Sequence, residues 1–129
     1  MRIISGKLKG KLINYLKNKT TRPLKDSVKE NIFNILEHSI LVNVKIKDSF
    51  ILDLYSGVGS FGIECLSRGA EKVTFIEKDK NALDILKENL IQLSVISQAK
   101  IINNKVENIL NIHEKIKYDI FFLILHLLI

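Results

Sequence analysis

One short stretch of this chain limits its possible folds more than any other: an apolar segment followed at once by three closely spaced glycines. Residues 50–54 have the length and hydrophobicity of a buried strand. Gly57, Gly59 and Gly62 follow with the spacing Gly-x-Gly-x-x-Gly. Glycine permits a sharp turn and a close approach of a ligand to the backbone. A strand, a glycine turn and a helix in this order are typical of a nucleotide-type site at the carboxyl edge of a sheet.

The residues around this motif alternate between strand and helix patterns. We expect strands at 50–54, 72–76, 100–102 and 120–125, and helices at 61–68, 80–93 and 106–112. Gly69 is expected to close the first of these helices. Alternating strands and helices indicate βαβ units, and therefore an α/β fold with a parallel sheet. The helix at 80–93 has a leucine stripe that we expect in the core, made of Leu83, Leu86, Leu90 and Leu93.

A further helix is expected before this α/β unit. Pro23 interrupts the chain, because its ring fixes φ and biases the preceding residue to extended geometry. Ser27 and Glu30 have the spacing of a capping box, so the helix should begin near Ser27. Its expected apolar face consists of Val28, Ile32, Ile35 and Leu36.

Positive charge is concentrated at the N-terminus. Residues 1–30 contain nine Lys or Arg against two acidic residues, a net charge of +7, while the whole chain of 129 residues carries +6. The remainder is therefore close to neutral, with a net charge of −1. A basic segment on a neutral body is the electrostatic pattern expected for a polyanion partner. A solvated charge run would give the same composition, so both interpretations stand at this point.

Other features exclude some classes of protein. Cys65 is the single cysteine, which rules out an intramolecular disulfide, and its apolar neighbours indicate a small core residue. His38, His113 and His126 lack metal-ligand spacing, so no metal site is expected. The N-terminus shows no signal peptide, and the apolar stretch 120–129 is shorter than the ~20 residues of a membrane span. We therefore expect a cytoplasmic protein.

Two carboxylates suggest which ligand the glycine turn serves. Asp53 stands at the end of the first strand, where its negative charge disfavours a pyrophosphate and suits a cationic ligand. Glu77 ends the second strand, where a carboxylate can accept hydrogen bonds from ribose hydroxyls. S-adenosylmethionine carries both a sulfonium and an α-ammonium group, so it fits better than a dinucleotide. The alternative is a turn that binds nothing, with both acids solvated.

Residues 53–64, Asp-Leu-Tyr-Ser-Gly-Val-Gly-Ser-Phe-Gly-Ile-Glu, and then 66–70, Leu-Ser-Arg-Gly-Ala, resemble the RsmD family. Members of that family are bacterial methyltransferases that modify the N2 of a guanine in 16S ribosomal RNA. The opening residues 1–7 are also similar to the family, as are Thr21-Arg22-Pro23, the block 28–36 and Phe75-Ile76-Glu77-Lys78-Asp79. The resemblance runs in register from Met1 to about Leu123.

The resemblance implies a Rossmann-like fold of S-adenosylmethionine-dependent methyltransferases, incomplete at its C-terminus, with a basic N-terminal arm or hairpin. The arm would be residues 1–25 and the partial methyltransferase domain residues 26–129. The implied partner is ribosomal RNA in the small subunit, and the implied state is a monomer with no metal and no membrane. The implied cofactor-binding residues are Asp53, Tyr55, Gly57, Gly59, Glu77, Lys78 and Asn104, and the implied RNA-binding residues are Arg2, Lys7, Lys9, Lys11, Arg22 and Lys25.

The sequence departs from the family at two places. Where the family usually has an acidic residue near the adenine, this chain has Asn104, whose amide can still contact the base. The family's Asn/Asp-Pro-Pro-Phe/Tyr motif, which holds and stacks the target guanine, is expected after residue 123, but this chain reads Ile-Leu-His-Leu-Leu-Ile over 124–129. We therefore assign no catalytic residue, and expect the chain to be inactive. The alternative is a non-catalytic RNA-binding remnant.

The sequence of residues 124–129 suggests a truncation or a frameshift. Codons exist for these six residues that, shifted by one base, would encode Asn or Asp followed by Pro-Pro-Phe. This predicts a one-base slip near Phe121 and Phe122. The gene sequence tests the hypothesis, because it fails if no one-base change restores Pro-Pro in frame.

Overall fold

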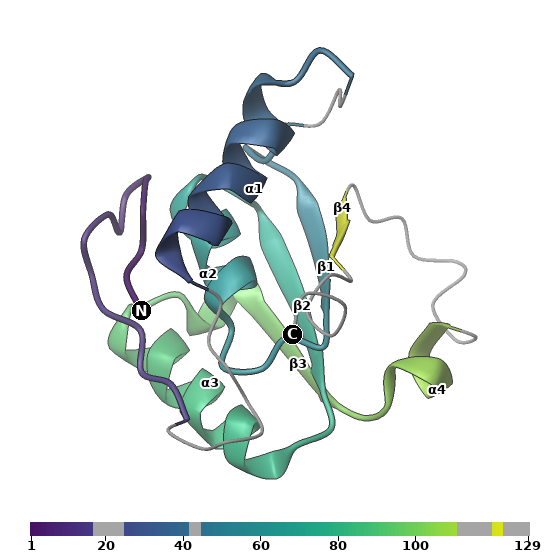
Figure 1. Cartoon of the computed structure of the whole chain (residues 1–129). Coiled ribbons are helices and arrows are strands. Elements are labelled where there is room, and N and C mark those ends of the chain that lie inside the picture. The colour runs from purple at the N-terminus through teal and green to yellow at the C-terminus, as the bar shows by residue number, and fades with distance from the viewer. Residues whose placement is uncertain (17–24, 42–44, 111–119, 123–129) are drawn as a thin grey trace.

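A computed structural model of the chain describes residues 1–16, 25–41, 45–110 and 120–122. The helices and strands succeed one another much as the sequence pattern predicts (Figure 1). In chain order they are α1 (Asp26–His38), β1 (Phe50–Leu54), α2 (Ser60–Ser67), β2 (Lys72–Glu77), α3 (Lys80–Gln92), a 3-10 turn η1 (Ile96–Gln98), β3 (Ala99–Asn103), α4 (Val106–Leu110) and β4 (Ile120–Phe122).

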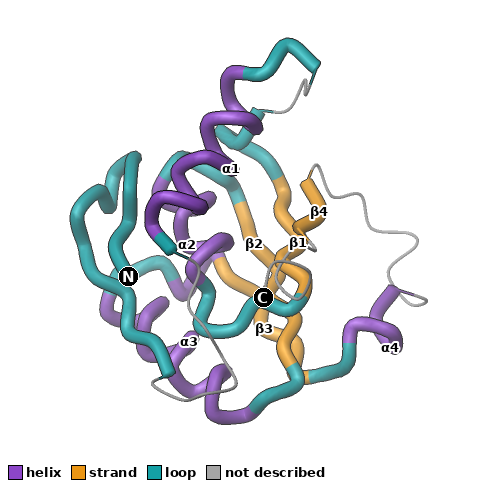
Figure 2. The backbone as a smooth tube through the Cα atoms, viewed as in Figure 1, coloured by secondary structure: helices purple, strands orange, loops and turns teal. Residues whose placement is uncertain are grey.

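The strands form one sheet in the order β3-β2-β1-β4, and every neighbouring pair is parallel (Figure 2). Asp53 of β1 stands opposite Phe75 of β2 and Phe122 of β4. β1 therefore lies in the interior of the sheet, with β2 on one side and β4 on the other. The predicted α/β class with a parallel sheet is confirmed.

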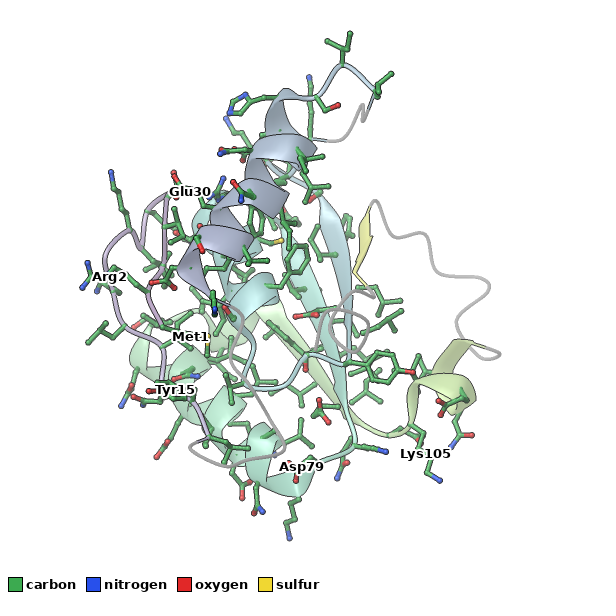
Figure 3. The ribbon with its side chains drawn as sticks, in the orientation of Figure 1. Met1, Arg2, Tyr15, Glu30, Asp79 and Lys105 are labelled. Carbon is green, nitrogen blue, oxygen red and sulfur yellow. The ribbon has the colours of Figure 1, made fainter. Side chains whose placement is uncertain are left out.

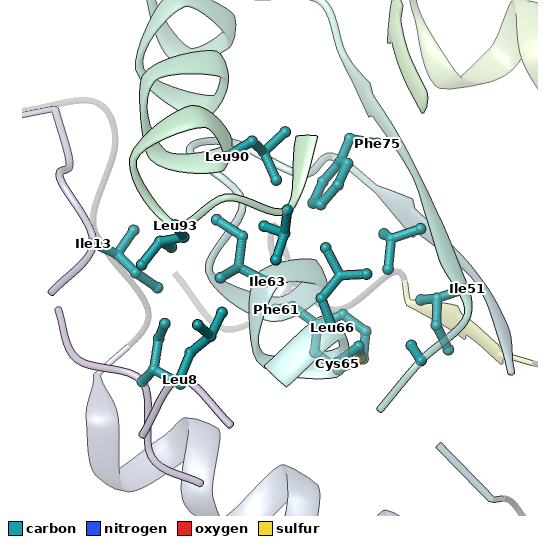
Figure 4. Close-up of a cluster of buried hydrophobic side chains, with 14 of the residues drawn as sticks. Leu8, Ile13, Ile51, Phe61, Ile63, Cys65, Leu66, Phe75, Leu90 and Leu93 are labelled. Carbon is teal, nitrogen blue, oxygen red and sulfur yellow. The ribbon is translucent and has the colours of Figure 1, made fainter. Parts of the chain in front are cut away.

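Alternate residues of the central strands pack on opposite faces of the sheet. Ile51, Val73 and Phe75 join the larger buried cluster, which also contains residues of α1, α2 and α3. Leu52, Leu54 and Ile76 join a smaller cluster with Val106 and Ile109 of α4. Helices therefore cover both faces, as in a doubly wound sheet. The leucine stripe of α3 and the thiol of Cys65 are buried in the larger cluster as predicted (Figure 4).

Gly62 allows α2 to lie directly against the sheet. A Cβ at this position would overlap the Phe75 ring and stand 2.8 Å from Val73 Cγ1. The third glycine of the motif therefore serves helix–strand packing. Gly69 has φ +104° and follows the last turn of α2, so the predicted glycine termination of this helix is confirmed.

We expect Gly62→Ala to lower the free energy of unfolding by about 1–3 kcal/mol, because the added methyl overpacks the contact with Phe75. On helix propensity alone the same change would stabilise by about 1 kcal/mol, so the sign of the effect is diagnostic. Urea denaturation measures it. Adding Phe75→Leu should restore part of the loss, and a stabilised single variant would contradict the contact.

The start of α1 differs from the prediction. Lys25, and not Ser27, occupies the N-cap position, and no side chain caps the helix there. The helix buries Lys29 and Phe33, whereas Ile35 is 58% exposed. The expected apolar face was wrong in this respect, because a long-range ion pair described below turns Lys29 toward the core.

Residues 1–16 fold back on themselves and pack against the rest of the molecule. Arg2 and Leu12 form an antiparallel bridge, and the Ile3 amide donates to the Lys11 carbonyl at 2.9 Å. Ile3, Leu8 and Ile13 are buried in the larger cluster, where Leu8 and Ile13 lie near Leu93, which directly follows α3 (Figure 4). The domain boundary near residue 25 stays a prediction.

Several predicted features fall outside the described residues. These are the break at Thr21-Arg22-Pro23, the end of the 106–112 helix, the end of the 120–125 strand, His113, His126 and the whole stretch 124–129. Within the described ranges, no helix is long and apolar enough to cross a membrane.

Candidate functional site

The chain leaves β1 through a tight loop at residues 55–59. Tyr55, Gly57 and Gly59 all have positive φ, at 56°, 57° and 94°. The left-handed region is unfavourable for a residue with a Cβ, so Tyr55 is held there by its surroundings. The Ser56 amide donates to the Ile76 carbonyl at 3.0 Å, which ties the loop to the end of β2. The loop is therefore fixed by the tertiary structure as well as by its glycines.

Gly57 and Gly59 have different roles in this loop. A Cβ on Gly57 would meet nothing within 4 Å, so open space lies beside it. A Cβ on Gly59 would overlap Leu86 of α3 and stand 3.1 Å from Ile63 Cδ1. Gly57 therefore leaves room for a ligand. Gly59 was also predicted to bind the cofactor, but the side on which a Cβ would stand faces the core.

Glu77 connects this loop to the end of β2. Its Oε2 accepts a hydrogen bond from the Gly57 amide at 2.9 Å, and its Oε1 accepts from the amides of Lys78 and Asp79, both at 3.0 Å. A carboxylate offers about four acceptor positions, so three are used and about one remains, on Oε2. The half-exposed side chain can therefore accept one further donor, such as a sugar hydroxyl, without breaking an internal bond.

Asp53 lies beneath the loop and is fully buried. Its Oδ2 accepts from the Gly62 amide at 3.1 Å, while Oδ1 has no hydrogen-bond partner among the described residues. Burial raises the pKa of the Asp53 carboxyl to about 8, the Gly62 hydrogen bond opposes this shift, and the charge of Glu77 adds to it. The sequence placed this acid correctly at the strand end, but the structure removes it from solvent.

A pocket opens beside Glu77, at the carboxyl ends of β2 and β3. Its lining residues are Tyr55, Ile76, Glu77, Lys78, Asn104, Lys105, Val106 and Glu107. Four residues predicted to bind the cofactor meet here, namely Tyr55, Glu77, Lys78 and Asn104, whereas Asp53, Gly57 and Gly59 are not part of the lining.

The far wall of the pocket comes from the start of α4. Asn104 Oδ1 accepts from the Lys105 amide at 2.7 Å and from Asn108 Nδ2 at 2.9 Å, which fixes the turn into that helix. The Tyr55 hydroxyl donates to Glu107 Oε1 at 3.5 Å, and both residues line the pocket. Sequence reasoning missed Lys105 and Glu107. Their position directly after the third strand was the available signal.

The polar groups at this site suit a ligand that donates hydrogen bonds. Asp53 Oδ1 and Ser56 Oγ are buried at the loop without a partner in the described part of the chain, and Glu77 has acceptor capacity left. Open space adjoins Gly57. Hydroxyl and ammonium groups would satisfy such acceptors, so these residues fit S-adenosylmethionine. No group of three or more His, Cys, Asp or Glu within the described ranges could hold a metal ion.

The residues predicted to bind RNA lie elsewhere. Arg2, Lys7, Lys9, Lys11 and Lys25 are exposed, and Arg22 falls outside the described residues. In Figure 3 Arg2 lies on the opposite side of the ribbon from Lys105, which marks the pocket. The basic N-terminal segment and the pocket thus form two separate surfaces.

Comparisons with known proteins agree with this geometry. A family model described as "Conserved hypothetical protein 95" matches residues 1–124. The chain is 38% identical over 123 residues to ribosomal RNA small subunit methyltransferase D of Buchnera aphidicola subsp. Baizongia pistaciae, covering 95% of this chain and 59% of the relative. It is 43% identical over 104 residues to the Haemophilus influenzae protein of the same name, covering 80% of this chain and 51% of the relative.

Solved structures show the same similarity. "Putative methyltransferase yhhF" from Escherichia coli has a TM-score of 0.71 and 31% sequence identity, over 85% of this chain and 55% of that one. The fold is therefore the Rossmann-like fold of S-adenosylmethionine-dependent methyltransferases. The chain spans between one half and three fifths of the length of these relatives.

Proposed function

Because this chain belongs to the RsmD family, we propose that it carries the S-adenosylmethionine-binding part of an enzyme that methylates ribosomal RNA. The observation that supports this most is the carboxylate of Glu77, which joins the Gly57 amide to the end of β2 and keeps an acceptor position toward the adjoining pocket. When bound, S-adenosylmethionine supplies a methyl group on a sulfonium, which is already activated for transfer.

The residues of the site then have distinct tasks. Glu77 would accept a hydrogen bond from a ribose hydroxyl, and the pocket lined by Asn104 and Val106 would receive the adenine. Asp53 lies beneath the loop, where a cationic group of the bound ligand would favour the ionised form of its carboxyl. Gly57 leaves open space in which a ligand could approach the backbone. Together they orient the donor, and orientation supplies much of the rate of such a transfer.

The finer assignment follows the resemblance to the family. We propose that the substrate is 16S ribosomal RNA, that the target atom is the N2 of a guanine, and that the exposed basic residues of the N-terminal segment hold the RNA through its phosphates. The Asn/Asp-Pro-Pro-Phe/Tyr motif does not occur in these 129 residues, whose single proline is Pro23. These residues alone should therefore bind the donor without transferring its methyl group.

Calorimetry with S-adenosylhomocysteine, followed by incubation with small ribosomal subunits and labelled S-adenosylmethionine, tests the proposal. We expect saturable binding of the first ligand and no incorporation of label. Absence of binding by the folded chain would overturn the proposed donor site, and incorporation of label would overturn the proposed inactivity.

Glu77→Gln should weaken binding of S-adenosylhomocysteine at least tenfold, because a hydrogen bond to a charged group contributes about 1.5–3 kcal/mol. The amide also places a donor where the carboxylate faces three backbone N–H groups. Calorimetry measures the loss. The matched control is Glu71→Gln, an exposed glutamate that directly precedes β2, at the end of the strand opposite Glu77. Equal affinities of the two variants would remove Glu77 from the site.

A second function, that of a non-catalytic RNA-binding module, is favoured by the exposure of the described basic residues of the N-terminal segment, none of which lines the pocket. Such a module would bind RNA with a strong salt dependence and would not bind S-adenosylhomocysteine. Measuring both affinities on one sample separates the two functions.

A further inference from the structure

Asn89 of α3 is a buried polar residue that connects two distant parts of the chain. Asn89 is 1% exposed, and its side chain lies between residues 1–16 and the glycine loop. Its Oδ1 accepts from the Asn14 amide at 2.9 Å, and its Nδ2 donates to the Asn14 carbonyl at 3.0 Å. The same Nδ2 donates to the carbonyl of Val58 at 3.1 Å. One amide group thus joins the N-terminal segment to the loop.

The chemistry of this position requires an amide. An asparagine side chain has two N–H donors and a carbonyl acceptor, and here both donors and the acceptor are engaged. Val58 stands between Gly57 and Gly59, so its carbonyl belongs to the loop that borders the proposed donor site. Loss of the amide would leave the buried Val58 carbonyl and the part-buried backbone groups of Asn14 without these partners, which is unfavourable.

The opposite end of the N-terminal segment reaches the same loop by another route. Lys29 Nζ donates to the Arg2 carbonyl at 2.7 Å and to Ser60 Oγ at 3.3 Å, and Ser60 follows Gly59 directly. Glu64 accepts from the amides of Ile4 and Ser5 at 2.9 and 3.1 Å. The segment is therefore attached at two neighbouring points, Val58 within the loop and Ser60 at the start of α2.

We propose that Asn89 is a positioning residue of the donor site, which holds the glycine loop in its binding conformation only while residues 1–16 are docked. The proposal rests on the proposed function. It makes docking of the basic N-terminal segment and binding of the methyl donor two coupled equilibria, so that each favours the other. A partner that engages the segment would thereby alter the donor affinity without touching the pocket.

The first test compares Asn89→Ala with Gln92→Ala. Gln92 lies on the same helix and accepts from Asn14 Nδ2 at 3.3 Å, so it contacts the segment without contacting the loop. For Asn89→Ala we expect faster hydrogen exchange at the Gly59 amide, which donates to the Ser56 carbonyl, together with about tenfold weaker binding of S-adenosylhomocysteine. Gln92→Ala should change neither measurement.

The second test breaks the connection from the side of the segment, which leaves Asn89 and the loop unaltered. Asn14→Pro removes the backbone N–H that donates to Asn89 Oδ1, whereas Asn14→Ala keeps that N–H and loses only the side-chain contact with Gln92. Exchange at Gly59 should accelerate in the proline variant alone. This pair also keeps the proposal testable if Asn89→Ala does not fold.

The outcomes separate a coupling role from a purely structural one. A structural role would lower the unfolding midpoint of Asn89→Ala while the folded protein kept its affinity and its Gly59 exchange rate, and that result would overturn the proposal. Faster hydrogen exchange at the Asn14 amide but not at the Gly59 amide of Asn89→Ala would overturn it as well. If the unaltered chain binds no S-adenosylhomocysteine, the proposed function fails, but the exchange measurements still decide whether segment and loop are coupled.

Discussion

Glu64→Ala is expected to lower the free energy of unfolding by about 3–5 kcal/mol, the range found when one partner of a buried ion pair is removed. Both side chains of the Lys29–Glu64 pair are 0% exposed, with 3.4 Å between Lys29 Nζ and Glu64 Oε1. Glu64 also accepts from Arg68 Nε at 2.9 Å and from the amides of Ile4 and Ser5. Its loss would remove this acceptor from the buried Lys29 ammonium and from two part-buried backbone N–H groups.

The substitution should weaken the contacts among three parts of the structure, because the Glu64 carboxylate joins α1, α2 and residues 1–16. Stabilities of single domains are about 5–15 kcal/mol, so the variant would lose a large share of its stability. Chemical denaturation measures the change. The control is Glu37→Ala, which removes the partly exposed carboxylate that pairs with Arg68 Nη1 at 2.9 Å and should cost about 0–1 kcal/mol. Similar losses in the two variants would contradict the role of the buried pair.

Burial also lowers the pKa of the Lys29 ammonium, while the charge of Glu64 raises it. Without Glu64 the lowering is less opposed, and the lysine should be neutral more often in the folded protein. Glu64→Gln should lower the free energy of unfolding less than Glu64→Ala, because the amide oxygen can still accept from one backbone N–H.

Asp53→Asn is expected to make the folded chain more stable at pH 8 than the unaltered chain, by several kcal/mol. Burial raises the pKa of Asp53 from 3.8 to about 8 in the folded state. Between these values the folded state keeps a proton that the unfolded state has lost, so stability falls as the pH rises from about 4 to about 8. The slope is about 1.4 kcal/mol per pH unit, which sums to on the order of 5 kcal/mol.

Asparagine is neutral at every pH and can still accept from the Gly62 amide, so this contribution to the slope should disappear. The two proteins should have similar stabilities near pH 4 and diverge above it, as measured by urea denaturation at several pH values. Asp84→Asn, an exposed position on α3, is the control and should leave the pH profile unchanged. Parallel profiles for Asp53→Asn and the unaltered chain would show that Asp53 is not protonated in the folded state.

The carboxylate at residue 53 would then be a cost in stability that serves the proposed donor site. Binding sites often retain such unfavourable groups, so variants that stabilise the fold weaken function there. The same Asp53→Asn protein should therefore bind S-adenosylhomocysteine more weakly at pH 8.

The sequence alone predicted the sheet, the glycine loop and the strand-end acids, because each of these is a local pattern. Strand and helix periodicity determine which residues face the core, and the Gly57–Gly62 spacing determines where the chain turns. The leucine stripe of α3 was found in the core for the same reason. Resemblance to the family could add the cofactor and the substrate, but not the surroundings of any side chain.

Only the tertiary structure decided what each polar residue does. In the sequence, Lys29 is one of several lysines in a basic stretch, and Asn89 is one polar residue on an amphipathic helix. Their partners are distant in the chain, since Lys29 meets Glu64 and Asn89 meets Asn14 and Val58. Asp53 and Glu77 have the same local pattern, yet one is buried beneath the loop and the other reaches the pocket. Burial and long-range pairing set the charge and the role of such groups, and periodicity carries no information about either.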